Sequence, residues 1–179
     1  MRRGFKSEAE RISLAARSAL GLGPLDRLDP WEYAKHLKVV VLNFDELDLA
    51  AEHRQQLALD SDSWSGMTLK VESEFAIVLN PHHAPTRNCA TLMHELAHII
   101  LKHAPARVER SSTGMMLLSD YSEEQEDEAD WLSAALLIPR HALLHYRGSS
   151  ASVAQVASTF GVSPALCEWR LRMTGVDTQ

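Results

Sequence analysis

The most constraining feature of the sequence is an apolar segment from Thr86 to Lys102 that carries a cluster of polar side chains in its middle. Its length and its lack of glycine and proline predict a buried α-helix. His94 and His98 are four residues apart, so one helical turn places both imidazoles on the same face, with Glu95 beside them. Because burying these groups unpaired is costly, they need polar partners or a metal ion.

This His-Glu-x-x-His spacing is typical of a zinc site. Each imidazole can direct a ring nitrogen to one ion at about 2.0–2.1 Å. Glu95 is then placed to contact a water on the metal and to act as a general base. The alternative is a pair of hydrogen-bonded core histidines beside an incidental glutamate. The apolar surroundings favour the metal, and zinc is the expected ion, although other divalent ions fit the same ligands.

A second buried helix is predicted to begin at an acidic stretch, residues 123–130. Ser122-Glu123-Glu124-Gln125 matches the capping-box pattern, which marks the start of a helix. The apolar residues that follow continue to Ile138, and Pro139 ends the helix because proline restricts the residue before it. A catalytic zinc needs a third protein ligand, and this helix offers several carboxylates for that role.

Helical spacing divides these carboxylates into two groups. Glu126 and Asp130 lie on one stripe, whereas Glu124 and Glu128 point to the opposite side. An inward Glu126 would need a cation such as zinc; otherwise Glu126 is a solvated residue of the first turn, where the helix dipole favours acid. Asp130 is either a surface charge or the acceptor for the second N–H of a ligating histidine. Spacing alone leaves both alternatives open.

The rest of the pattern predicts helices at both ends of the chain and short strands between them. Helical periodicity and capping signals mark the helices, and short β-branched or alternating runs mark the strands. The expected helices are 7–20, 29–37, 152–160 and 164–174, and the expected strands are 39–42, 66–71 and 75–79. No element is predicted for residues 43–63 or 104–121.

This order of elements predicts an α+β fold, in which a small antiparallel sheet packs on a helical core. We expect one main domain at residues 1–147. It contains N-terminal helices at 7–37, the sheet at 39–80 and the catalytic helices at 86–146. We expect residues 148–179 to form a C-terminal helical hairpin, similar to a helix-turn-helix, that packs on this domain.

Composition narrows the partners and the compartment. With 179 residues and a formal net charge of −6, the chain has the size of one domain and disfavours non-specific binding to DNA phosphates. Its two cysteines indicate reduced thiols rather than a disulfide framework. The basic N-terminus lacks the apolar stretch of a signal peptide, and no apolar run is long enough to cross a membrane. We therefore expect a cytoplasmic protein without a membrane partner.

Four stretches of the sequence together resemble the ImmA/IrrE family of metallo-endopeptidases. They are Phe75–Asn80, Arg87–His103, Glu126–Pro139 and Phe160–Ser163. The likeness extends over about residues 64–174. The resemblance implies a zincin-like core that binds one zinc ion per chain, with His94, His98 and Glu126 as its ligands and Glu95 as the catalytic glutamate.

The sequence departs from the usual family pattern at three places. Ala97 stands where glycine is common, Ile138 where methionine is common, and Asp130-Trp131-Leu132 where asparagine-x-phenylalanine often occurs. These differences concern the subfamily and the substrate rather than the metal site. The resemblance further implies an intracellular bacterial or phage protease. Its substrate would be a helix-turn-helix transcriptional repressor encoded nearby, whose cleavage releases stress-response or mobile-element genes.

In the implied mechanism, Glu95 takes a proton from the attacking water and passes it to the leaving amine. Peptide hydrolysis also needs a donor that stabilises the oxyanion. The residues able to supply one are Tyr121, His103, His141, His145 and Arg87, and the sequence does not distinguish between them.

Two other functions compete with proteolysis on the sequence alone. Residues 153–164 resemble the first helix and turn of a helix-turn-helix unit, so the last helix would enter a DNA groove. That helix has Arg170 and Arg172 against Glu168, a thin basic face that favours packing on the core. The chain could instead be a non-proteolytic interaction module, as in a toxin–antitoxin pair, but a structural metal site would not need Glu95.

Overall fold

The structure, a computed structural model, describes residues 1–44, 64–110, 116–149 and 151–176. Within them the chain forms seven helices and one five-stranded sheet, which confirms the α+β prediction. The helices are α1 (Phe5–Ala19), α2 (Pro30–His36), α4 (Pro85–Leu101), α5 (Glu123–Leu137), α6 (Arg140–Arg147), α7 (Val153–Phe160) and α8 (Pro164–Thr174). The strands are β1 (Val40–Leu42), β2 (Gly66–Val71), β3 (Glu74–Leu79), β4 (Arg107–Arg110) and β5 (Met116–Ser119). Most of the polar segment 43–63, for which no element is predicted, lies outside the described residues.

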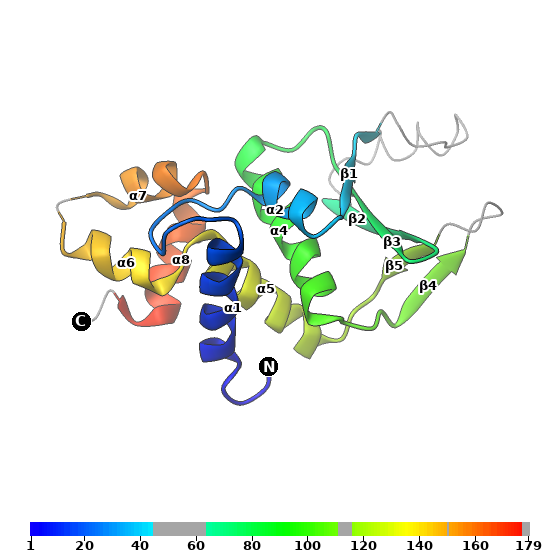
Figure 1. The fold of residues 1–179 in the computed structure, drawn as a ribbon, viewed down its shortest axis with the longest axis horizontal. Coiled ribbons are helices and arrows are strands. Elements are labelled where there is room, and N and C mark those ends of the chain that lie inside the picture. The colour runs from blue at the N-terminus through cyan, green and yellow to red at the C-terminus, as the bar shows by residue number, and fades with distance from the viewer. Residues whose placement is uncertain (45–63, 111–115, 150, 177–179) are drawn as a thin grey trace.

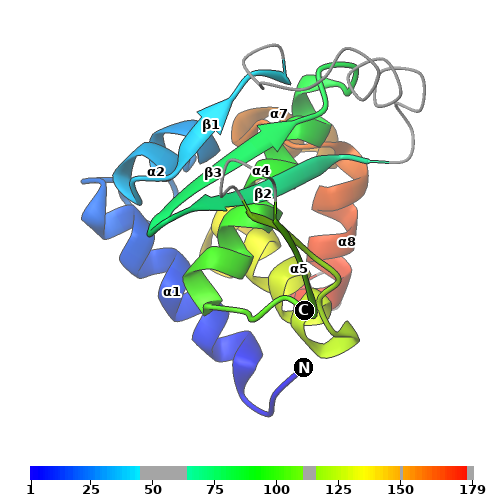
Figure 2. The same ribbon diagram turned by 90° about the vertical axis from the view of Figure 1, so that its right-hand side faces the viewer.

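Helix α4 occupies the centre of the molecule, between the sheet and α5 (Figure 1). It begins with Pro85 at its first position, where a missing N–H leaves no hydrogen bond unmade. Leu92, Met93 and Leu96 of this helix are completely buried. In Figure 2 the sheet lies in front of α4, which packs against β2 and β3 on one side and α5 on another. A polar side chain between these layers therefore needs a partner nearby.

The sheet has the order β1-β3-β2-β5-β4 and is mixed. β2 and β3 form the expected antiparallel hairpin, in which Met67 lies opposite Val78. β1 runs parallel to β3, with Val40 opposite Ala76, so the prediction of an antiparallel sheet was wrong for this strand. The physical reason is that β2 separates β1 from β3 in sequence. A tight turn imposes the antiparallel direction only on strands that it joins directly.

β4 and β5 form a second hairpin within residues 104–121, where the sequence predicts no element. They pair from Arg107 opposite Ser119 to Arg110 opposite Met116. β4 consists mainly of charged residues and lies at the edge of the sheet, so it lacks the apolar alternation by which strands are recognised. β5 in turn pairs with β2, which attaches the hairpin to the rest of the sheet.

The C-terminal helices α6, α7 and α8 lie at the end of the molecule away from the sheet (Figure 1). The guanidinium of Arg170 holds α8 against the core. This side chain is completely buried, donates from Nε to the Ile138 carbonyl at 3.0 Å and forms an ion pair with Glu10 of α1. Trp169 adds an edge-to-face contact with Trp131, with ring centroids 5.8 Å apart. One of the two arginines that a DNA-binding α8 would present is therefore enclosed within the protein.

None of the described helices is both long enough and apolar enough to span a membrane.

Candidate metal centre

Three potential ligand atoms converge between α4 and α5. Nε2 of His94 lies 3.0 Å from Nε2 of His98, and Oε2 of Glu126 lies 3.2 Å from the first nitrogen and 3.7 Å from the second. Ligands at 2.0–2.1 Å from a tetrahedral ion are about 3.3 Å apart, so the observed separations bracket the spacing that zinc requires. Two imidazoles and one carboxylate also leave a fourth position for a further ligand. This group could hold a metal ion.

The start of α5 is fixed by a capping box that places Glu126 next to the paired imidazoles. Ser122 accepts a hydrogen bond from the backbone N–H of Gln125, whose side chain accepts one from the backbone N–H of Ser122. The N–H of Glu126 then donates to the Ser122 carbonyl at 2.9 Å, which makes Glu126 part of the first turn. These local bonds fix the first turn. They therefore also fix the backbone position from which the Glu126 side chain extends toward α4.

His98 has the electrostatic environment of a neutral imidazole. Burial, followed by the neighbouring imidazoles of His94 and His103, lowers the pKa of His98 to about 3. At neutral pH its ring therefore carries one proton and keeps one lone pair. A neutral imidazole is the form of histidine that binds metals.

His94 is held by carboxylates on both sides of its ring. Its Nδ1 lies 2.9 Å from Oδ1 of Asp130, while its Nε2 faces Glu126. Burial lowers the pKa of His94, but the hydrogen bond to Asp130 and the charges of Glu95, Asp130 and Glu126 outweigh it and raise the pKa above its ordinary value. With Nδ1–H donated to Asp130, the Nε2 lone pair is directed at the potential metal position.

Glu95 lies on the side of α4 that faces β2. Thr68 of β2 donates a hydrogen bond from its Oγ1 to Oε2 of Glu95, with 2.5 Å between the oxygens. Burial raises the pKa of Glu95, and the bond from Thr68 and the charge of His94 lower it in part. A carboxylate with a raised pKa is a stronger base than an ordinary glutamate, and one oxygen is already fixed in direction.

The close approach of β2 to α4 depends on a glycine. A Cβ atom on Gly66 would lie 2.7 Å from Cγ2 of Thr91 and 3.6 Å from Cγ of Glu95. The first of these distances is too short for two carbon atoms, so a side chain at this position would push β2 away from α4. Gly66 therefore keeps the strand close to the helix face that carries Glu95.

Two cavities flank the group of potential ligands. A cavity of about 420 Å³ is lined by His94, Glu95 and Asp130 together with Gly66, Leu166 and Trp169. A second cavity, of about 540 Å³, lies beside His98 and includes Tyr121, Phe75, Lys70 and Lys102 in its wall. The first cavity includes His94 and the second includes His98, so each provides space next to one of the potential ligands.

Tyr121 is the oxyanion-donor candidate whose ring stacks on that of a potential metal ligand. Its ring stacks on that of His98, with centroids 3.8 Å apart and planes inclined by 25°. Burial, and then the charges of Glu95 and Glu126, raise the pKa of Tyr121 to about 12, so its phenol keeps the proton needed for donation.

The other four candidates have different contacts or lie on another helix. His103 contacts Nδ1 of His98, on the side away from the ligand group, and Arg87 donates to Oγ of Ser65 at 3.0 Å. His141 and His145 belong to α6.

Sequence reasoning missed two contacts of the site. It did not single out Thr68, and it assigned no contact to Glu128, which is buried and faces His103. The sequence places Thr68 in the alternating strand that precedes the helix. That position alone does not show which face of the strand meets Glu95. For Glu128 the spacing indicates a direction away from Glu126 but not what lies there.

The family comparison matches this geometry. The family model of the IrrE N-terminal-like domain, peptidase family M78, matches residues 38–172, which include α4, α5 and every potential ligand. No curated protein matches the chain. The match covers well over half of the chain and contains the complete His94, His98 and Glu126 group. The chain therefore belongs to the ImmA/IrrE family of metallopeptidases and is a metallo-endopeptidase.

Proposed function

We propose that this chain is a zinc-dependent endopeptidase in which His94, His98 and Glu126 hold the ion and Glu95 is the general base. The observation that carries the proposal is the convergence of three ligand atoms at separations of 3.0, 3.2 and 3.7 Å. Glu95 follows His94 directly and lines the adjacent cavity. A carboxylate in that place serves a hydrolase, since a purely structural metal has no use for it.

Proton transfer is the task of Glu95. When bound, zinc supplies a Lewis acid that lowers the pKa of water toward about 7. Glu95 accepts the proton of the attacking water, and the oxygen of that water forms the bond to the scissile carbonyl carbon. Glu95 then passes the same proton to the amine nitrogen as the C–N bond breaks. The hydrogen bond from Thr68 keeps one carboxylate oxygen fixed, so the other is available to receive and return the proton.

Tyr121 is the donor that we assign to the oxyanion. Its phenol is protonated at neutral pH and its ring lies on His98 at the edge of the second cavity. In this role the O–H donates to the carbonyl oxygen as negative charge develops there.

The proposed substrate is a helix-turn-helix transcriptional repressor encoded near this chain, and the proposed compartment is the cytoplasm. Family membership supports the substrate class, and two buried free thiols, Cys89 and Cys167, suit a reducing compartment. Cleavage would release genes for a stress response or a mobile element. The cavities beside His94 and His98 give room for side chains that flank a scissile bond.

The test is incubation of the full chain with the repressor encoded by the adjacent gene, with and without a chelator. We expect two repressor fragments that disappear with chelator and return with added zinc. Glu95→Gln keeps the shape of the side chain but removes the base, so this variant should bind zinc without producing fragments. An intact repressor in a stable complex with the zinc-loaded chain would indicate a non-proteolytic interaction module. Full cleavage by Glu95→Gln would refute the role of Glu95.

A further inference from the structure

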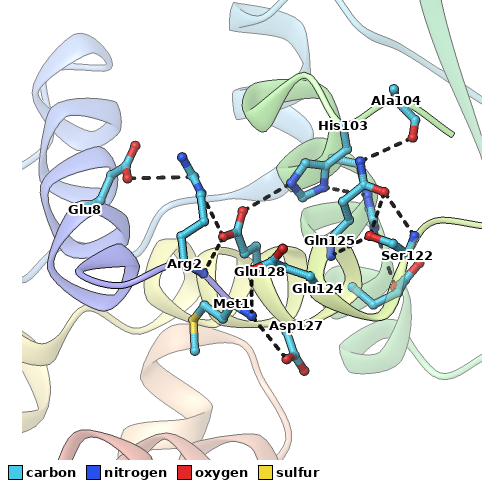
Figure 3. A network of polar contacts seen from close by, with 12 residues as sticks. Met1, Arg2, Glu8, His103, Ala104, Ser122, Glu124, Gln125, Asp127 and Glu128 are labelled. Atoms are coloured by element: carbon cyan, nitrogen blue, oxygen red, sulfur yellow. Dashed lines mark hydrogen bonds and ion pairs between the residues drawn. The ribbon is translucent and has the colours of Figure 1, made fainter.

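A second set of polar contacts reaches His98 at Nδ1, whereas its Nε2 faces the other potential ligands. Nδ1 of His98 lies 3.0 Å from Nδ1 of His103, just beyond the end of α4. Nε2 of His103 lies 3.6 Å from Oε2 of Glu128 on α5. Figure 3 shows the ring of His103 directed toward the Glu128 carboxylate. The two imidazoles and the carboxylate thus form a continuous line.

Glu128 is anchored at its other oxygen. Oε1 accepts hydrogen bonds from Nε of Arg2 at 2.8 Å and from the backbone N–H of Arg2 at 2.9 Å (Figure 3). The carboxylate is enclosed by the protein, because 5% of the Glu128 side chain and 7% of the His103 side chain is exposed. A buried carboxylate with two donors on one oxygen is fixed in place and presents the second oxygen to His103.

The direction of these contacts determines which nitrogens carry protons. Nε2 of His98 faces His94 and Glu126, so it needs a lone pair to bind a metal. Its single proton then lies on Nδ1 and points at Nδ1 of His103, which accepts it. The proton of His103 consequently lies on Nε2, where it points at Glu128. The N–H of His98 thus meets an acceptor at 3.0 Å, and the N–H of His103 faces the negative charge of Glu128 at 3.6 Å, an electrostatic contact longer than a hydrogen bond.

We propose that His103 and Glu128 are positioning residues, which hold the ring of His98 in the orientation and tautomer that direct Nε2 to the metal. The inference rests on the proposed metal site. Helix α5 then acts on both ring nitrogens of His98: Glu126 faces Nε2, and Glu128 reaches Nδ1 through His103. Asp130 from the same helix contacts Nδ1 of His94, so each imidazole has its own outer partner.

The test measures zinc affinity in the full chain by competition with a chromophoric chelator. We expect Glu128→Gln and His103→Phe each to weaken zinc binding by about 10- to 100-fold. Glu123→Gln is the matched control, because this exposed glutamate lies in the first turn of the same helix; its affinity should equal that of the unaltered chain. Unchanged zinc affinity in Glu128→Gln would overturn the proposal.

A double variant separates positioning from a general structural role. If Glu128 acts through His103, the combination of His103→Phe with Glu128→Gln should bind zinc no more weakly than His103→Phe alone. Additive losses would show that Glu128 does not act through His103. His103→Gln retains an acceptor and a donor and should recover part of the affinity lost in His103→Phe, whereas no recovery would contradict a hydrogen-bonding role.

Two further measurements keep the result distinct from misfolding and from failure of the proposed function. Thermal unfolding of the metal-free variants reports folding directly, and affinities are compared at temperatures where each variant is folded. The visible spectrum of the cobalt-substituted protein reports ligand geometry, and we expect it to change in Glu128→Gln but not in Glu123→Gln. If the unaltered chain binds no metal, the proposed function fails; if it binds zinc and cleaves while Glu128→Gln is unaffected, this inference alone fails.

Discussion

Oδ1 of Asp130 lies 2.9 Å from Nδ1 of His94, across the imidazole from the nitrogen that faces Glu126. Both carboxylates come from α5 and are four residues apart, so one helical turn spans the ring of His94. Two carboxylates of a single helix therefore set the orientation of this imidazole. The effect of this orientation can be measured as zinc affinity.

For Asp130→Asn we expect zinc affinity to fall by about 10- to 100-fold, because the amide is a weaker acceptor for the His94 N–H and carries no charge. Chelator competition measures the change. Asp127→Asn is the control, since Asp127 lies on the same helix but contacts the N-terminal amine of Met1 rather than a potential metal ligand. Equal affinities in the two variants would mean that the Asp130 contact has no influence on metal binding.

Removal of the Thr68 hydroxyl should affect chemistry more than metal binding. In Thr68→Val the carboxylate of Glu95 loses a fixed direction, and a hydrogen bond to a charged group is worth about 1.5–3 kcal/mol. We expect kcat to fall about 10- to 100-fold with unchanged zinc content, measured on a fluorogenic peptide from the cleaved substrate. The exposed Thr86 of α4 provides the control variant Thr86→Val. Loss of zinc together with activity would assign Thr68 to metal binding instead.

Tyr121→Phe tests the donor for the oxyanion. This change removes one hydroxyl and preserves the ring that stacks on His98. Loss of a donor of this kind lowers kcat by about 10²- to 10³-fold, and we expect KM to change little because the interaction develops in the transition state. A variant with normal kcat would exclude Tyr121 from this role.

The thiol of Cys89 should make stability depend on pH in the alkaline range. Burial raises the pKa of Cys89 from an ordinary 9.0 to about 11 in the folded chain. Above pH 9 the thiol loses its proton in the unfolded chain at a lower pH than in the folded chain. The stability that the buried, protonated thiol contributes is therefore fully present below pH 9 and is lost as the pH rises toward 11.

Urea unfolding at pH 8 and pH 10 measures the effect of this thiol. Between these pH values, the free energy of unfolding should fall by about 1 kcal/mol more in the unaltered chain than in Cys89→Ala. Cys89→Ala can itself lower stability, but only the difference between the two pH values is compared. An identical pH dependence in both proteins would contradict a shifted thiol.

Arg170 is expected to be essential for the attachment of α8. Arg170→Met removes this donor from the buried Ile138 carbonyl and from the Glu10 carboxylate, whose side chain is 18% exposed; we expect a loss of about 3 kcal/mol, at the low end for a buried pair. Chemical denaturation measures the loss. The exposed Arg172 on the same helix gives the control Arg172→Met, for which a change within about 0.5 kcal/mol is expected. Equal stability of both variants would show that the buried pair contributes nothing net.

The helices of the site could be predicted because their signals are local. The apolar run around His94 and the capping box at Ser122 are readable in short windows, and the structure places α4 and α5 within two residues of the expected bounds. The helical spacing also indicates which side of each helix carries the potential ligands. These local rules place His94 and His98 on one face of α4, whereas Glu126 is singled out as a ligand by the family resemblance; the structure brings all three into one group that could hold a metal ion.

The partners of the site residues could not be predicted, because they come from distant parts of the chain. Thr68 is 27 residues from Glu95, and Arg2 is 126 residues from Glu128. Helical spacing places Glu128 away from Glu126, but it does not tell whether water or another segment covers that side. The answer depends on where the segment before α1 passes, which is a property of the packed molecule.

The cavity of about 420 Å³ beside His94 and Glu95 has one wall made by Leu166 and Trp169 of α8. The residues assigned to chemistry come instead from the middle of the chain. Changes in that last helix can thus alter which peptides are accepted without disturbing bond cleavage itself. Exchange of α8 side chains is accordingly the natural route to retargeting such an enzyme.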